Sequence, residues 1–221
     1  TGTWTVAIVA WAGSFLVMLL VLAVSARVND NMTLLILGML FSSGVGALVN
    51  ILQYYSSESV LKSFIVWTMG SLGSITGQQL YVVAPAVLAG VVLAFLKIKD
   101  LNAFLLGENY ARSLGVRIGR SRLVIFAGAS LLAGTITAFC GPIGFIGIAA
   151  PHLARVLFRS SNHLLLVPAT LLTGANVMLL SDIISQLPGM GSTLPINSVT
   201  ALLGIPVVIW MIVRNRKFAS L

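Results

Sequence analysis

Long stretches without a charged side chain constrain the fold of this chain more than any other feature. Residues 123–154 form one such stretch, with 32 consecutive residues and no Asp, Glu, Lys or Arg among them. Over all 221 residues, 58% are hydrophobic and 8% are charged, whereas a soluble domain has roughly 25% charged residues. So few charges cannot cover a water-facing surface, which excludes a soluble enzyme and a disordered tail. Much of the chain must face lipid.

The uncharged stretches predict an all-α fold, a polytopic transmembrane helical bundle with about seven spans. A helix needs about 20 apolar residues to cross the hydrocarbon core of a bilayer. The stretch 123–154 is too long for one span, and its glycines and proline at Gly141-Pro142-Ile143-Gly144 interrupt a helix. The spans expected are residues 6–26, 34–54, 80–96, 123–140, 145–158, 164–187 and 199–213. Residues 55–79 are more polar at their start, and they predict a short interfacial helix with a glycine-rich turn.

The distribution of basic residues predicts how the bundle lies in the membrane. The chain has 13 Lys and Arg and 5 Asp and Glu, for a net charge of +8. With seven spans, 12 of the 13 cations fall in loops of one side, and Lys62 is alone on the other. Since basic loops stay in the cytoplasm, we expect a cytoplasmic C-terminus and an outer N-terminus. The 12 are Arg27, Lys97, Lys99, Arg112, Arg117, Arg120, Arg122, Arg155, Arg159, Arg214, Arg216 and Lys217.

The longest of the basic loops, residues 97–122, has its own helical pattern. Its apolar residues predict two short amphipathic helices, with Gly107 between them and Gly115 after the second. Such a pair indicates either a contact surface for a partner or two helices lying on the membrane, and the pattern leaves both open. The apolar positions are Leu101, Leu105 and Leu106 in the first helix and Ala111 and Leu114 in the second.

The segment 141–155 is the most distinctive in the chain. Glycines at 141, 144 and 147 allow a close backbone approach or an unwound turn at the outer face. Pro151 predicts a kink in the helix that follows. His152 and Arg155 come near the cytoplasmic end of that helix, where an interfacial histidine at a structural kink is favoured over a ligand.

Residues with possible chemistry are few. No second His or Cys lies at metal-ligand spacing from His152, and His163 is expected to be solvated in a polar turn. Asp182 is the one acid inside a hydrophobic run. Intramembrane acids often mark a pathway, and a helix-pairing role is equally open. There is no Walker-type phosphate loop and no nucleophile–base pair in a loop, so we expect no catalytic, cofactor or metal site.

Two other classes share parts of this layout. Seven-helix receptors and retinal proteins also have an outer N-terminus, but a retinal protein needs a Lys in its last span, and residues 194–213 contain none. A secondary transporter or channel, driven without ATP, is the other alternative. The chain has one acid in a hydrophobic run, Asp182, and a single acid is weak support for an ion-coupled relay.

Four motifs, in order, resemble those of the FecCD-type permeases, the membrane subunits of bacterial ABC importers for vitamin B12, haem and ferric siderophores. Residues 141–155 resemble the signature GPIGFxGxxxPHxxR, and residues 106–115 resemble the coupling loop LGExxAxxLG. Residues 179–182 are similar to LLxAD, with Ser181 in place of Ala. Residues 194–206 resemble LPxGxVTALxGxP, with Asn197 at the usual Gly, and Thr193 stands before them at the usual Glu.

The resemblance implies a type II ABC importer permease of ten helices, of which this chain carries the last seven. About three N-terminal helices would then be missing, as the start at Thr1 on the outer side, without a signal peptide, also indicates. The implied setting is the bacterial cytoplasmic (inner) membrane, with the lipid bilayer around the chain. The partners would be a second permease subunit (identical or homologous), two ATP-binding subunits and a substrate-binding protein, with ATP and Mg in the ATPase and no nucleic acid.

The resemblance also assigns roles to residues. An iron chelate (siderophore or haem) or cobalamin would cross between the two permease subunits, with an inner gate near residues 25–32. Gly107 and Glu108 would form the turn of the coupling loop, from which Ala111 and Leu114 would face the ATPase. The full sets are Leu106, Gly107, Glu108, Ala111, Leu114 and Gly115 for coupling; Gly141, Pro142, Gly144, Gly147, Pro151, His152, Arg155, Asp182, Pro195, Thr200, Gly204 and Pro206 for the motifs and pathway; and Ser25, Asn29 and Asn31 for the gate.

Overall fold

A computed structural model describes residues 3–25, 31–187 and 194–216, and all regular structure in these ranges is helical. The expectation of an all-α fold is confirmed. The helices are α1 (Thr3–Ser25), α2 (Asn31–Tyr54), α3 (Glu58–Met69), α4 (Gly77–Leu96), α5 (Ile98–Phe104), α6 (Glu108–Ser113), α7 (Ile118–Cys140), α8 (Ile146–Phe158), α9 (His163–Ser185) and α10 (Ile196–Arg216).

Five of these helices are long and apolar enough to cross a membrane, namely α1, α2, α4, α7 and α9. The other two expected spans, residues 145–158 and 199–213, correspond to α8 and α10. α8 has 13 residues, which gives it a length of about 20 Å against a hydrocarbon core of about 30 Å. α10 has 21 residues. The short helix predicted within residues 55–79 is α3, and it ends at Gly70.

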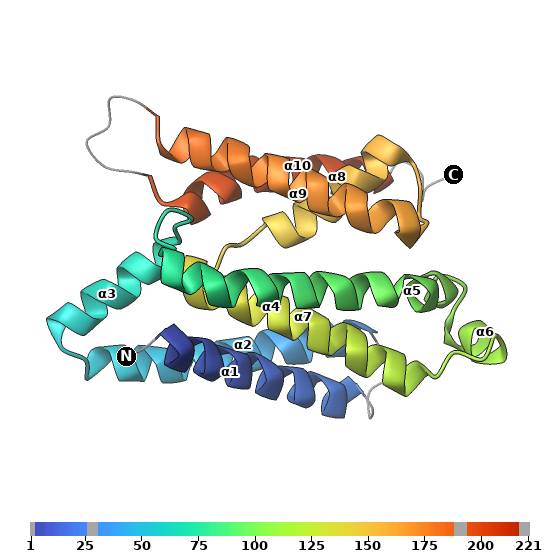
Figure 1. Cartoon of the computed structure of the whole chain (residues 1–221), viewed down its shortest axis with the longest axis horizontal. Helices are drawn as coiled ribbons and strands as arrows, with labels where there is room; N and C mark the ends of the chain where they lie inside the picture. Colours follow the sequence, from blue (N-terminus) through green and yellow to red (C-terminus); the bar gives the residue numbers. More distant parts are fainter. Residues whose placement is uncertain (1–2, 26–30, 188–193, 217–221) are drawn as a thin grey trace.

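The helices form layers that run along one axis (Figure 1). α8, α9 and α10 make one outer layer, α4 and α7 lie in the middle, and α1 and α2 lie on the opposite side. Small residues let α7 approach its neighbours, since a Cβ added at Gly90 of α4 would lie 2.5 Å from Cγ of Leu132. α1 is also bonded to α7, since Trp11 Nε1 of α1 donates a hydrogen bond of 2.8 Å to Thr135 Oγ1.

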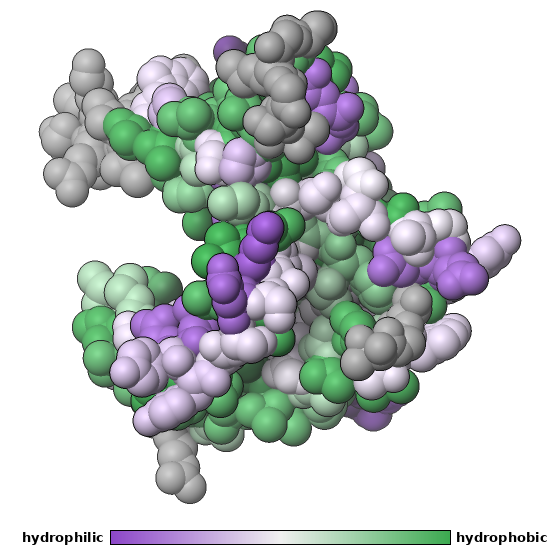
Figure 2. Space-filling view, turned by 90° about the vertical axis from the view of Figure 1, so that its left-hand side faces the viewer, coloured by the Kyte–Doolittle hydropathy of each residue, from purple (hydrophilic) through white to green (hydrophobic). Residues whose placement is uncertain are grey.

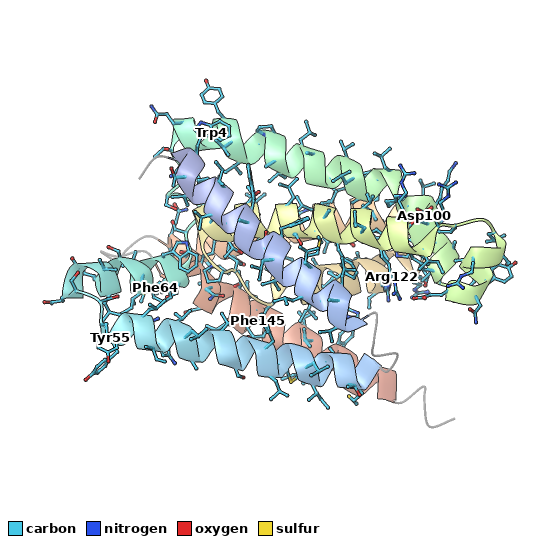
Figure 3. The ribbon with its side chains drawn as sticks, turned by 90° about the horizontal axis from the view of Figure 1, so that it is seen from below. Trp4, Tyr55, Phe64, Asp100, Arg122 and Phe145 are labelled. Atoms are coloured by element: carbon cyan, nitrogen blue, oxygen red, sulfur yellow. The ribbon has the colours of Figure 1, made fainter. Side chains whose placement is uncertain are left out.

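The basic loops meet at one end of the molecule, which we call the α5–α6 end. It consists of α5, α6, the start of α7, the end of α8 and the start of α9. Figure 3 shows Asp100 and Arg122 at this end, with Tyr55 and Phe64 at the opposite end, beside α3. Among the described side chains, the cations at the α5–α6 end are Lys97, Lys99, Arg112, Arg117, Arg120, Arg122, Arg155 and Arg159, while Lys62 lies on α3.

One side of the bundle is open and apolar. Figure 2 looks onto the α3 end and shows a hollow at mid-height, between the layer of α8–α10 above and the layer of α1 and α2 below. α2 leaves most of its apolar side chains uncovered, and no residue of its hydrophobic stretch Leu35–Tyr54 is buried. Such a helix needs lipid or another protein against it. The uncovered side chains include Leu35, Met39, Leu40, Leu48 and Leu52.

Candidate functional site

The turn between α5 and α6 depends on Gly107. Its φ is +94°, a backbone conformation that side chains other than glycine adopt at a cost. The Gly107 carbonyl accepts a 3.0 Å hydrogen bond from the Ala111 amide, which starts α6. Glu108 follows in the first turn, where a carboxylate favours the helix dipole, and it forms an ion pair with Arg122 of α7. The turn expected at Gly107 and Glu108 is therefore present.

The end of α6 is closed by a Schellman motif. Gly115 has φ +84°, and its amide donates to the Arg112 carbonyl at 3.0 Å, while the Val116 amide donates to the Ala111 carbonyl at 3.1 Å. These two hydrogen bonds provide donors for two backbone carbonyls that would otherwise have no partner at the end of the helix. Both glycines of the loop motif thus fix the shape of the two-helix unit.

The apolar surface of the loop differs from the one predicted. Ala111 is predicted to face a partner, but its side chain is 0% exposed, so it is covered within the chain itself. The exposed apolar side chains are instead Leu105, Leu106, Tyr110 and Leu114, each at least half exposed. Helical spacing alone missed Tyr110 because a six-residue helix is too short for its pattern to show which face is covered.

A charged hydrogen-bond centre at Asp100 ties α5 to α7. Asp100 Oδ2 accepts 2.8 Å and 2.6 Å hydrogen bonds from Lys97 Nζ and Ser121 Oγ. Ser121, near the start of α7, is 2% exposed. The hydrogen bond from Lys97, followed by that from Ser121, lowers the pKa of Asp100 below its ordinary value. The sequence analysis did not single out Asp100, since a loop carboxylate among lysines gives no local signal of its partner 21 residues away.

At the α3 end, the motif glycines have different roles. Gly141 has φ +83°, and a Cβ there would lie 2.3 Å from the Trp67 carbonyl oxygen and 3.0 Å from Gly70 Cα. The Ser71 amide donates to the neighbouring Cys140 carbonyl at 2.9 Å. A Cβ at Gly144 would make an ordinary contact, and one at Gly147 would meet nothing within 4 Å. Of the two alternatives left open for these glycines, a close approach is found at Gly141, Gly144 lies in the irregular segment before α8, and Gly147 lies inside α8.

The segment between α7 and α8 is held against α10. Asn197 Oδ1 accepts a 3.1 Å hydrogen bond from the Gly144 amide, a bond that the usual glycine at this position cannot provide. Phe145 has φ +65° without being a glycine. A Cβ on Gly204 would lie 2.7 Å from Phe145 Cβ, so the absence of a side chain at Gly204 leaves room for the Phe145 side chain.

The other motif residues of α10 build the same contact region. Thr200 is fully buried, and its hydroxyl donates a 3.0 Å hydrogen bond to the Asn197 carbonyl. The Pro195 carbonyl accepts from the amides of Ser198 and Val199 at 3.1 Å and 3.2 Å, which begins α10. Pro206 lies inside α10, and Pro142 lies in the irregular segment before α8.

The candidate polar residues do not form one site. Pro151 lies inside α8, His152 is half-buried and Arg155 is exposed. Asp182 Oδ2 accepts a 2.8 Å hydrogen bond from Gln186 on its own helix. Among the described residues, no three His, Cys, Asp or Glu side chains are grouped so that they could hold a metal ion.

The predicted gate is only partly described. Ser25 ends α1 and Asn31 begins α2, while Asn29 lies outside the described residues. His163, expected to be solvated, instead contacts Asn102 of α5 through its backbone amide and its ring. The sequence analysis missed Asn102 because the two residues are 61 positions apart.

Residues 1–214, nearly the whole sequence, match the model of the FecCD transport family. The geometry of the motifs described above agrees with this match. The chain belongs to the FecCD transport family. It is 32% identical over 212 residues to the hemin transport system permease protein HmuU of Yersinia pestis, covering 96% of this chain and 63% of that protein. It is 34% identical over 213 residues to the vitamin B12 import system permease protein BtuC of Klebsiella pneumoniae, covering 96% and 64%.

A solved structure has the same fold. It is described as an inward-facing conformation of a metal-chelate type ABC transporter, and it matches with a TM-score of 0.77 and 34% sequence identity. The match covers 90% of this chain and 64% of that one. This FecCD-family chain therefore spans somewhat less than two thirds of the length of the relatives that it matches.

Proposed function

We propose that this FecCD-family chain is part of the transmembrane permease subunit of an ATP-driven importer for an iron chelate (siderophore or haem) or cobalamin. The substrate classes come from the names of the relatives, which are permeases for hemin and for vitamin B12. The observation that carries the proposal is the α5–α6 unit, a compact pair of helices with four exposed apolar side chains among basic residues. An ATPase needs such a contact in order to drive the bundle.

In this proposal the chain performs no hydrolysis itself. Two ATP-binding subunits bind ATP and Mg, and closure of their dimer moves the α5–α6 unit. α4 and α7 are joined directly to this unit by the chain, and Asp100 and Glu108 hold it to α7. The helices then rock to open the pathway alternately to each side.

A second permease subunit and a substrate-binding protein complete the assembly. The uncovered apolar side of α2, together with the hollow in Figure 2, supports a pathway between two permease subunits. Ser25 ends α1 and Asn31 begins α2, and in this proposal they form the inner gate together with Asn29. The α3 end, at the opposite pole from the ATPase, would receive the binding protein.

The proposed membrane orientation puts the α5–α6 end in the cytoplasm of a bacterial cell, with the C-terminus on the same side. In the inner membrane, a cysteine introduced at Ser57, beside α3, should react with an impermeant thiol reagent added from outside. A cysteine at Ser161, between α8 and α9, should react only after the membrane is opened, since basic loops stay inside. The reverse labelling pattern would contradict the orientation.

Co-purification separates this proposal from a secondary transporter or channel. The natural full-length subunit, purified from its own membrane in mild detergent, should bring an ATP-binding protein with it in stoichiometric amount. One carboxylate oxygen of Asp182, Oδ2, accepts a hydrogen bond from Gln186 at the C-terminal end of the same helix, a local contact that gives no support to an ion relay. Ligand uptake by the purified subunit without any ATPase would contradict the proposal.

A further inference from the structure

The α5–α6 unit also contacts α9, a helix of the other outer layer, and Asn102 makes hydrogen bonds across this contact. We infer that Asn102 is a positioning residue that fastens the α5–α6 unit to the first turn of α9, so that α9 moves with the unit during transport. This inference rests on the proposed function and adds to it a route for the movement. The chain connects the unit directly to α4 and α7 only, whereas α9 is reached by contact.

Asn102 uses both ends of its amide in this contact. Its Nδ2 donates a 2.8 Å hydrogen bond to Asn162 Oδ1. Its Oδ1 lies 2.8 Å from the His163 backbone nitrogen and 2.8 Å from His163 Nδ1. Three hydrogen bonds thus join one residue of α5 to the two residues at which α9 begins.

The backbone donors fix which way the two amides point, an assignment that rests on hydrogen bonding rather than on visible hydrogens. The His163 amide can only donate, so the atom of Asn102 that faces it must be the oxygen. The Leu164 amide likewise donates to the side chain of Asn162 at 2.9 Å, so the Asn162 atom that accepts this bond is Oδ1. Because Asn102 contacts the same oxygen, Asn102 must donate an N–H to it. His163 Nδ1 must then carry a proton, which both the neutral Nδ1–H tautomer and the imidazolium provide.

The same contact is continuous with the packing of the outer layer. Asn162 is the N-cap of α9 through its bond to the Leu164 amide, and such a cap stabilises the start of a helix. One turn further on, Leu166 and Ala169 are buried against Ala154 of α8. A displacement of Asn102 would therefore reach the first turn of α9 and, through it, α8. In Figure 1, α9 begins beside α5 at the α5–α6 end.

The test uses the complete natural subunit, assembled with its ATPase and reconstituted in vesicles with loaded binding protein. Asn102→Ala should leave the assembly intact and the ATPase active, while ligand uptake per ATP hydrolysed falls about tenfold, the effect of one to two lost hydrogen bonds. Asn109→Ala, an exposed asparagine on α6, is the matched control and should couple normally. Normal coupling in Asn102→Ala would overturn the inference.

A cross-link distinguishes transmission from simple stability. Asn102→Cys and His163→Cys, combined with Cys140→Ser, remove the hydrogen bonds but allow a disulfide between α5 and α9. The reduced pair should couple as poorly as Asn102→Ala, and oxidation should restore uptake, since α5 and α9 are proposed to move together. Failure to cross-link, or uptake that stops on oxidation, would overturn the inference. Absence of ATP-driven uptake in the wild type would instead refute the proposed function.

Discussion

Replacing Gly141 by alanine is expected to abolish the folded protein, whereas the same change at Gly147 should leave it nearly unaffected. Both glycines belong to one motif and differ in their surroundings. A Cβ at 141 would lie 2.3 Å from the Trp67 carbonyl oxygen, at a φ of +83°, whereas a Cβ at 147 would have nothing within 4 Å. The obstacle at 141 is backbone at the end of α3, which no side-chain rotation can relieve.

The expected cost at Gly141 exceeds about 4 kcal/mol, the range of severe single substitutions, because backbone strain and a main-chain clash act together. The alanine at 147 should cost less than about 1 kcal/mol and even favours its helix slightly. The amount of protein in the membrane and the midpoint of thermal unfolding in detergent measure both variants. Equal midpoints for the two would show that α3 and α7 do not meet at Gly141.

A charge on the exposed apolar face of the α5–α6 unit is expected to disconnect the chain from its ATPase. Leu106→Arg and Leu114→Arg each place a guanidinium where an apolar side chain, at least half exposed here, would be buried in the complex. Loss of a central apolar contact costs about 2 kcal/mol or more at an interface, which corresponds to about thirtyfold weaker binding. Ala111→Arg does not test this contact, since Ala111 is buried inside the unit.

The measurement is the fraction of ATPase retained by the purified full-length subunit, with Asn109→Arg, on α6 between the two leucines, as the control of equal charge. The control should retain the ATPase, and all variants should reach the membrane in similar amount, because the changes lie on an exposed surface. Retention of the ATPase by both leucine variants would mean that the unit lies on the membrane surface rather than against an ATPase.

Composition and spacing predicted the long helices of this fold well, because an uncharged run of 20 or more residues has few alternatives to a membrane-spanning helix. Before α8, apolar residues continue through an irregular segment, and the break there was predicted from the glycines and proline at residues 141–144 rather than from hydropathy. Residues 141–145 are apolar, yet Gly141 and Phe145 have positive φ and no helix passes through them. Hydropathy averages over such a break, and only the glycine-proline motif indicates it.

The two short helices of the candidate site were predictable in their position along the chain but not in their contacts. Gly107 and Gly115 indicated a two-helix unit, and the structure has positive φ at both. The burial of Ala111 and the exposure of Tyr110 could not be predicted, since they depend on how α5 folds back on α6. The contact between Asn102 and His163 joins positions 61 residues apart, and no local pattern in either segment indicates the other.

ATP-driven uptake in vesicles tests the central claim most directly. The complete natural subunit is reconstituted with its ATPase, with ATP on the side of the α5–α6 end and binding protein loaded with labelled haem, ferric siderophore or cobalamin on the other. The account predicts that one of these ligands accumulates only while ATP is hydrolysed, and that collapsing ion gradients with an ionophore changes nothing. Uptake that follows an ion gradient and proceeds without ATP would contradict it.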